Sequence, residues 1–174
     1  MVLVVGGAIA VVIVERPALE DARDAVDNRW KPLRVPLTAR YAQLTNAQAA
    51  LVAAGFGDRS VSQDLERDLA DWEDAVASGN PGSEAEVANR LEADGKRLKA
   101  NAFGSSVLAQ VPNLLPAITG FDSAVPPAPL VDVYNQAVRA YESDRNDSLR
   151  KPVARLFGYD ARPVLVIETG PPPP

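Results

Sequence analysis

Apolar residues recur at helical spacing through the first third of the chain, and this periodicity constrains the fold more than any other feature. The recurring positions lie three, four or seven residues apart: Val26, Trp30, Leu33, Leu37, Tyr41, Leu44 and Leu51. Such spacing places them on one face of a helix. Pro32 and Pro36 interrupt this helix, because proline removes a backbone hydrogen bond. Since the stripe stays in phase across both prolines, we expect two nearly coaxial segments rather than a reversal.

Three further amphipathic segments follow. Gly55 and Gly57 end the first helix, and the next stripe comprises Val61, Leu65, Leu69, Trp72 and Val76. After a turn at 78–82, Ser83 and Glu86 form a capping box for a third helix, whose buried face comprises Val87, Leu91, Leu98 and Ala102. A fourth helix, bent at Pro152, runs from Leu130 to Leu156. We therefore expect an all-α fold, an antiparallel four-helix bundle whose long, kinked first helix continues an N-terminal membrane segment.

The run from Val2 to Val14 contains no charged residue and is bounded by Glu15 and Arg16. As a helix it measures about 20 Å, whereas the hydrocarbon core of a bilayer is about 30 Å thick. A buried helix and a signal-peptide core are the alternatives, but no Lys or Arg precedes the run. We expect a membrane anchor, completed either by residues before Met1 or by local thinning of the bilayer.

The distribution of basic residues predicts the topology of this anchor. Basic side chains follow the apolar run closely, and none precedes it: Arg16, Arg23, Arg29, Lys31 and Arg34. By the positive-inside rule, a single-pass protein of the cell membrane with a cytoplasmic bundle is expected. The expected organisation is an anchor at 1–14, a bundle at 15–160 and an extended tail at 161–174 that ends in polyproline.

Composition excludes several classes of function. The chain has 18 basic and 23 acidic residues, a net charge of −5, and therefore no basic field that would attract nucleic acid. It contains neither cysteine nor histidine. Thiolate catalysis, zinc sites built on Cys or His, Ser-His-Asp triads and the Glu-x-x-His motif of di-iron bundles are thereby excluded. We expect no enzymatic activity and no cofactor.

Polar residues within the helices provide the remaining candidates for a site. Asp64, Asp68 and Asp71 lie four and three residues apart, so they share a side of one helix and are a candidate site for Mg²⁺ or Ca²⁺. A solvated helix face is the alternative interpretation. Arg40, Asn101 and Asn135 lie near the apolar seams, where they could form a buried hydrogen-bond network or face outward to bind a partner.

Several short stretches resemble the LemA family of bacterial membrane proteins. The resemblance extends over residues 19–165 and rests on Val26 with Trp30, Arg40-Tyr41 with Asn46, Leu98-Lys99-Ala100-Asn101, the helix Tyr134-Asn135-Gln136-Ala137-Val138-Arg139-Ala140-Tyr141, and Val153–Tyr159 with Arg162-Pro163. The chain departs from the family pattern at Ala42, Gln43, Thr45 and Glu142. The resemblance implies a single-pass membrane protein with a helical-bundle domain and no known enzymatic activity. It also makes the matched positions Arg40, Asn46, Lys99, Asn101, Tyr134 and Asn135 candidates for binding.

These observations favour a membrane-tethered, non-catalytic bundle that presents a helical surface to a protein partner, such as another membrane protein. The alternative from a different class is an enzyme dependent on a divalent cation, which would use Asp64, Asp68, Asp71 and a lysine such as Lys99. A secreted bundle whose leader has been removed is a third possibility.

Overall fold

The computed structural model describes the backbone of residues 2–167 and the side chains of residues 15–167. Within this range the chain forms helices joined by loops, with no β-strand. The elements are α1 (Val2–Trp30), the 3₁₀ turn η1 (Lys31–Leu33), α2 (Arg34–Ala53), α3 (Ser60–Ser78), α4 (Pro81–Gly104), α5 (Ser106–Ala109), α6 (Leu114–Ser123), α7 (Ala128–Arg145) and α8 (Arg150–Phe157). The prediction of an all-α fold is confirmed.

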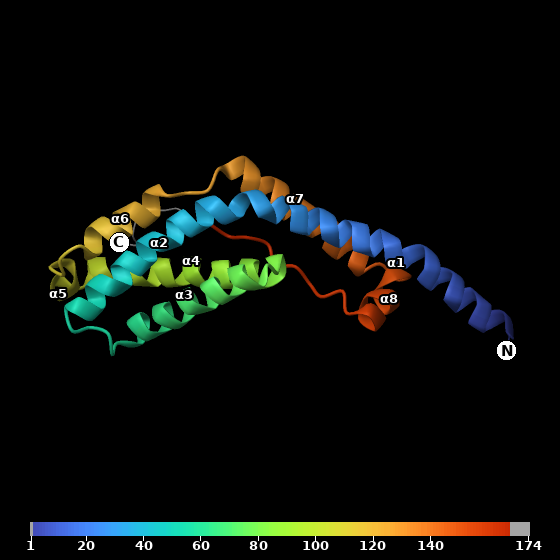
Figure 1. The fold of residues 1–174 in the computed structure, drawn as a ribbon, viewed down its shortest axis with the longest axis horizontal. Helices are drawn as coiled ribbons and strands as arrows, with labels where there is room; N and C mark the ends of the chain where they lie inside the picture. Colours follow the sequence, from blue (N-terminus) through green and yellow to red (C-terminus); the bar gives the residue numbers. More distant parts are fainter. Residues whose placement is uncertain (1, 168–174) are drawn as a thin grey trace.

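Helix α2 continues from α1 through η1 without a reversal of the chain, and the two helices meet at an angle, so that together they form an arch (Figure 1). Pro32 lies within the 3₁₀ turn, and Pro36 lies in the first turn of α2. Backbone N–H groups in a first turn have no partner within the helix, so proline forfeits little there. The chain does not reverse at the prolines, as expected, because the helix restarts between them. The two segments are nevertheless bent relative to one another and are not nearly coaxial (Figure 1).

Helices α2, α3, α4 and α6 pack against one another at the end of the molecule remote from the N-terminus (Figure 1). Gly79 ends α3 in the left-handed conformation, with φ of 67°, and Asn80 caps α4 by accepting hydrogen bonds from the N–H groups of Gly82 and Ser83. The capping box expected at Ser83 is therefore wrong. The helix begins earlier because Asn80 followed by Pro81 is a stronger start signal.

Helix α7 runs back along α1, and the short helix α8 packs against the same part of α1 (Figure 1). The fourth helix, expected to continue to Leu156, instead ends at Arg145. The Asp147 carboxylate accepts the N–H of Leu149 in the intervening turn, and Pro152 lies in the first turn of α8. Pro152 thus begins a new helix instead of bending a long one, because the preceding Asn-Asp-Ser sequence favours a turn.

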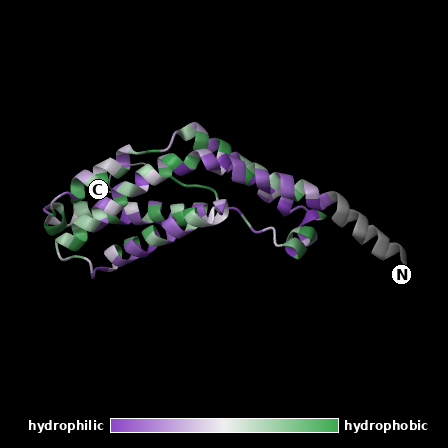
Figure 2. Cartoon of the chain, viewed as in Figure 1, coloured by the Kyte–Doolittle hydropathy of each residue, from purple (hydrophilic) through white to green (hydrophobic). Residues whose placement is uncertain are grey.

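A single large core extends through the molecule and contains the apolar stripes identified in the sequence, among them Val26, Trp30, Leu37, Leu65, Leu91 and Leu98. Hydrophilic and hydrophobic positions alternate along each helix, as Figure 2 shows by colour. A smaller cluster joins α8 to α1 through Leu19, Val153, Ala154 and Tyr159. The helices are therefore held together by burial of one face each.

The chain after α8 is extended and returns toward the remote end of the molecule (Figure 1). Leu165 is buried in the main core. The expected tail at 161–174 thus packs into the body as far as Ile167, whereas its polyproline end lies outside the described residues.

In the part of the chain that the structure describes, no helix is long and apolar enough to cross a membrane. The expected anchor at 1–14 lies outside the residues whose side chains are described.

Candidate functional site

Arg40, the first candidate from the resemblance, is fully buried and bound to groups of its own chain. Its Nε and Nη2 donate to the two carboxylate oxygens of Glu92 at 2.7 and 2.9 Å. Nη1 donates to the Phe121 carbonyl, and the guanidinium lies 3.7 Å from the centroid of the Phe121 ring. This side chain therefore joins α2, α4 and α6. Arg40 is part of a buried hydrogen-bond network and does not face outward toward a partner.

A second buried carboxylate joins α1 and α2 to α4. Glu84 accepts the indole N–H of Trp30 at 2.6 Å and both Nε and Nη2 of Arg34 at 2.7 and 2.6 Å. The Glu84 carboxylate holds the pKa of Arg34 above its usual value. Glu84 and Glu92 were not identified from the sequence, although spacing could have found Glu84, which lies seven residues before the buried Leu91. Glu92 is not in helical register with the predicted apolar stripe of this helix, so spacing gives no signal for it.

Lys99 and Asn101 occupy different environments on α4. The Lys99 ammonium group donates to the Asp122 carboxylate of α6 at 2.6 Å. Lys99 and Arg40 thus both attach to the C-terminal part of α6. Asn101 is exposed, and the structure brings it together with none of the other candidates. Lys99 has a structural role in this arrangement.

Tyr134 and Asn135 of α7 bind the extended chain after α8. The Tyr134 hydroxyl donates to the Pro163 carbonyl at 2.8 Å, and its ring packs edge-on against Trp30 with centroids 5.0 Å apart. Burial raises the pKa of Tyr134 well above its usual range. The Asn135 side chain donates to the Leu165 carbonyl at 2.8 Å and accepts the Leu165 N–H at 2.7 Å. Both residues therefore hold the tail.

Asn89 of α4 holds the same segment from the other side. Its side-chain amide donates to the Val164 carbonyl at 2.8 Å and accepts the Val166 N–H at 2.9 Å. Asn89, Tyr134 and Asn135 together form what we term the tail clasp. The two asparagine amides make the hydrogen bonds to the backbone that neighbouring strands would make to an extended segment in a sheet. No sequence pattern points to Asn89, because its role depends on the path that the tail takes through the fold.

Asp64, Asp68 and Asp71 face arginines. Asp64 accepts from Arg97 at 2.8 Å, Asp68 lies 3.2 Å from Arg67 and 3.3 Å from Arg90, and Asp71 pairs with Arg90. The hydrogen bond from Arg97 lowers the pKa of Asp64. Among the described residues, no group of three or more potential ligands could hold a metal ion. The arrangement is that of ion pairs between α3 and α4.

Asp94 has an unusual environment within these ion pairs. Burial, together with the negative charges of Asp68 and Asp64, raises its pKa from 3.8 to about 6, although Arg97 opposes this shift. Its Oδ2 atom is buried without a hydrogen-bond partner. Between pH 4 and 6, Asp94 therefore still holds its proton in the folded chain but has lost it in the unfolded chain. The unfolding free energy consequently falls as the pH rises through this range.

The Asp94→Asn variant is therefore expected to gain stability relative to the parent chain as the pH is raised. Between pH 5 and pH 7 the difference in unfolding free energy should grow by about 1 kcal/mol in favour of the variant, because asparagine does not ionise. Urea denaturation at the two pH values measures it. Asp74→Asn, at an exposed position on α3, is the control, and an equal response of both variants would contradict the assignment.

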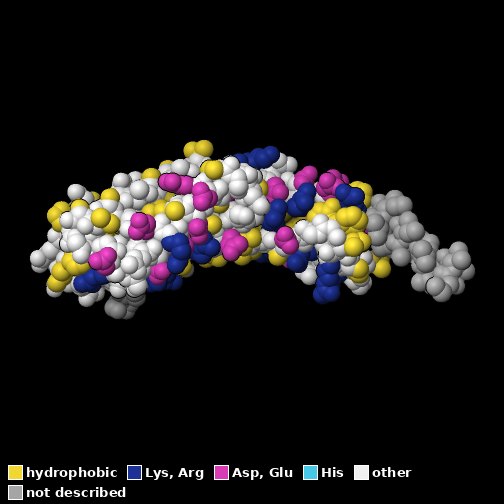
Figure 3. Space-filling model, turned by 60° about the horizontal axis from the view of Figure 1, so that its bottom comes forward, with side chains coloured by type: hydrophobic (Ala, Val, Ile, Leu, Met, Phe, Trp, Pro, Cys, Tyr) yellow, Lys and Arg dark blue, Asp and Glu magenta, His cyan; other side chains and the backbone are white. Residues whose placement is uncertain are grey.

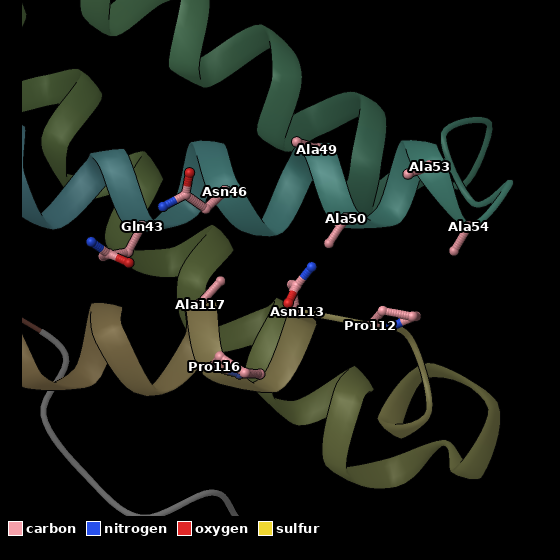
Figure 4. Close-up of a pocket in the computed structure, with 10 residues that line it drawn as sticks. All are labelled: Gln43, Asn46, Ala49, Ala50, Ala53, Ala54, Pro112, Asn113, Pro116 and Ala117. Carbon is pink, nitrogen blue, oxygen red and sulfur yellow. The ribbon is translucent and has the colours of Figure 1, made fainter.

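Asn46 lines a groove of about 580 Å³ between α2 and the loop that leads into α6 (Figure 4). The lining residues are uncharged: Gln43, Asn46, Ala49, Ala50, Ala53, Ala54, Pro112, Asn113, Pro116 and Ala117. Figure 4 shows the Asn113 side chain directed from the start of α6 toward Ala50 of α2. Asn113 has a positive φ of 65°, which asparagine tolerates better than most residues. We call this feature the amide groove.

Three side-chain amides of the groove, those of Gln43, Asn46 and Asn113, make no hydrogen bond with any other described residue. Each amide can both donate and accept, as a peptide unit does. The same chain uses two such amides to hold an extended backbone in the tail clasp. Asn46 was identified from the sequence, but Gln43 and Asn113 were not, because their proximity depends on how α6 packs on α2.

Comparison with models of known protein families, with curated proteins and with solved structures finds no match to this chain.

Proposed function

We propose that the chain is a single-pass membrane protein of the LemA type, without enzymatic activity, whose helical body holds a segment of a protein partner. In this proposal residues 1–14 belong to the anchor, and α2, α3, α4 and α6 form an antiparallel four-helix bundle in the cytoplasm. The basic residues that follow the apolar run support this orientation. The partner segment is an extended, uncharged peptide in the amide groove.

The observation that carries the proposal is the course of α1. This helix is continuous from Val2 to Trp30, and Leu19 is the first of its described side chains to be buried. A stretch of entirely apolar sequence thus precedes the part of α1 that packs against α7 and α8. Pro17 lies within α1 and has no N–H, so the Ile13 carbonyl lacks its partner in the helix. Elsewhere along the apolar run the helix supplies its own backbone hydrogen bonds, which a segment inside a bilayer requires.

The groove's chemistry supports a peptide as the occupant. Its lining offers three unpaired amides among alanine and proline side chains, and none of the ten residues is charged. A charged ligand would lose its hydration there without gaining a counterion, whereas a peptide backbone could exchange hydrogen bonds with the amides. Small alanine side chains on α2 leave space for a backbone to approach closely.

Membrane attachment is tested by fusing residues 1–18 to a soluble reporter and fractionating the cells. We expect the reporter in the membrane fraction, because the fused segment carries the complete apolar run. A matched fusion in which Val5 and Ile9 are replaced by aspartate should remain soluble, since each buried charge disfavours insertion by about 3 kcal/mol. A soluble reporter in the unaltered fusion would reject the anchor.

The groove is tested by photo-crosslinking in native membranes. A photoreactive residue at the groove position Ala53 should capture a discrete partner, and mass spectrometry of the adduct should identify an uncharged segment of that partner. Ala49→Glu places a charge in the groove and should lower the yield about tenfold or more. Ala39→Glu lies on the same helix outside the groove and should leave the yield unchanged. Equal yields in the two variants, or a charged or non-protein adduct, would contradict the proposal.

A further inference from the structure

A second pocket, of about 520 Å³, lies between α8 and the end of α7. Its lining carries three cations and one acid, namely Arg145, Lys151, Arg155 and Asp160. Arg145 is engaged, because its Nε donates to the Tyr159 carbonyl at 2.9 Å and its Nη1 donates to Glu142 at 3.0 Å. Lys151 and Arg155 are exposed, four residues apart on α8, and have no ion-pair partner among the described residues.

Three of the acidic residues around α8 accept hydrogen bonds from neighbouring groups. Glu15 and Asp144 each accept a hydrogen bond from Arg150 at 2.6 Å, and Asp147 accepts the N–H of Leu149. Asp160 is the only acid in the lining. The pocket therefore presents two cations, Lys151 and Arg155, to an incoming anion, and both side chains are good donors to phosphate oxygens.

The position of this pocket along α1 is fixed by several contacts. Arg150 binds Glu15, the Arg16 guanidinium lies 4.7 Å from the centroid of the Phe157 ring, and Arg23 lies 5.3 Å from that of Tyr159. Helix α8 therefore packs beside the turns of α1 that directly follow the apolar run. Leu19, at the centre of this contact, is five residues beyond Val14, a rise of about 7–8 Å along the helix.

The polar layer of a bilayer has a similar thickness. The headgroup regions add about 10–15 Å to a hydrocarbon core of about 30 Å, which is about 5–8 Å on each side. If the apolar run ends at the edge of the hydrocarbon, as the proposed function requires, α8 lies among the headgroups. Leu149 and Leu156 are 59% and 71% exposed there. Figure 3 shows apolar and basic side chains together at this end of the body.

We propose that the pocket formed by Arg145, Lys151 and Arg155 binds the phosphate headgroup of an anionic membrane lipid. This inference rests on the proposed membrane anchoring. Lys151 and Arg155 contact the phosphate, and the exposed leucines beside them enter the adjacent acyl region. The pocket fixes the orientation of the body at the bilayer surface, because α8 is attached to α1 through a buried cluster.

The test uses the full chain in maltoside micelles, which contain no phosphate. The chain has no cysteine, so a fluorophore on Ser148→Cys, in the turn before α8, is the only label. The titrants are dihexanoyl phosphatidylglycerol, dihexanoyl phosphatidylcholine and inorganic phosphate. We expect saturable binding of phosphatidylglycerol, weakened about 25-fold in Lys151→Gln/Arg155→Gln, because the loss of each contact between a cation and the anionic headgroup weakens binding about fivefold.

The matched control is Arg29→Gln/Arg59→Gln, which removes the same charge from exposed positions remote from α8 and should bind normally. Equal affinities of the two double variants would overturn the assignment of the pocket. Inorganic phosphate binding as tightly as phosphatidylglycerol would make it a site for a soluble anion instead. Flotation of the full chain with phosphatidylcholine vesicles separates the two proposals. A chain that does not float refutes the anchor, whereas one that floats but binds lipid independently of Lys151 and Arg155 refutes only the pocket.

Discussion

The Glu92→Gln variant is expected to unfold with a free energy about 3–5 kcal/mol below that of the parent chain. Arg40 is fully buried, and its strongest partner is the Glu92 carboxylate at 2.7 Å. Neutralising Glu92 removes the carboxylate charge that faces the buried guanidinium at 2.7 and 2.9 Å. The cost is the loss of that charge–charge interaction for a guanidinium that has given up its hydration on burial.

Urea denaturation of three variants separates this effect from a general loss of packing. Glu86→Gln, on the exposed side of α4, should change the unfolding free energy by less than about 0.5 kcal/mol. The double variant Arg40→Met/Glu92→Met removes both charges and should recover most of the loss, because apolar residues of similar volume can replace a buried pair. If the unfolding free energy of Glu92→Gln lies within about 1 kcal/mol of that of the parent, this ion pair is not the main interaction between α2 and α4.

Leu165→Ala is expected to lower the unfolding free energy by about 2–5 kcal/mol, a range typical of large-to-small substitutions in a core. Leu165 lies in an extended segment, yet only 2% of its surface is exposed and it belongs to the main core. Its backbone is held by Asn135, so the segment cannot readily shift to fill the space that the smaller side chain leaves.

The neighbouring positions provide controls within the same segment. Val164 and Val166 are 37% and 53% exposed, so alanine at either position should cost less than about 1 kcal/mol. Asn135→Ala should be intermediate, because it leaves the Leu165 backbone groups without their partners. Thermal or urea unfolding of the four variants would measure the order. Equal losses at 164, 165 and 166 would contradict the alternation that the tail clasp imposes.

The helical elements could be predicted because their apolar spacing is a local property of the chain. The stripe through Trp30, Leu37 and Leu44 is buried as expected, and the prolines within it fall where a helix restarts. The prediction failed where two local signals competed. Asn80-Pro81 began α4 ahead of Ser83, and the polar turn after Arg145 separated α8 from α7.

The candidate site was only partly predictable, since hydrogen-bond partners depend on packing between distant segments. Tyr134 and Asn135 were identified from the sequence, but their partners lie about 30 residues further along the chain, in a segment expected to extend beyond the bundle. Glu84 and Glu92 were overlooked because carboxylates are seldom fully buried unless they are paired. Their arginine partners come from α2, about 50 residues earlier in the sequence.

The path of α1, η1 and α2 determines how far the amide groove lies from the proposed anchor (Figure 1). Asn46 follows Val14 by 32 residues, which at about 1.5 Å per residue amounts to roughly 45–50 Å measured along the two helices. With an anchor at the start of α1, the amide groove would stand well above the headgroups. A partner that lies flat on the bilayer could not reach it, whereas one with a projecting loop or a long linker could. The protein would then act as a spacer that binds only partners with a segment extending far enough from the membrane.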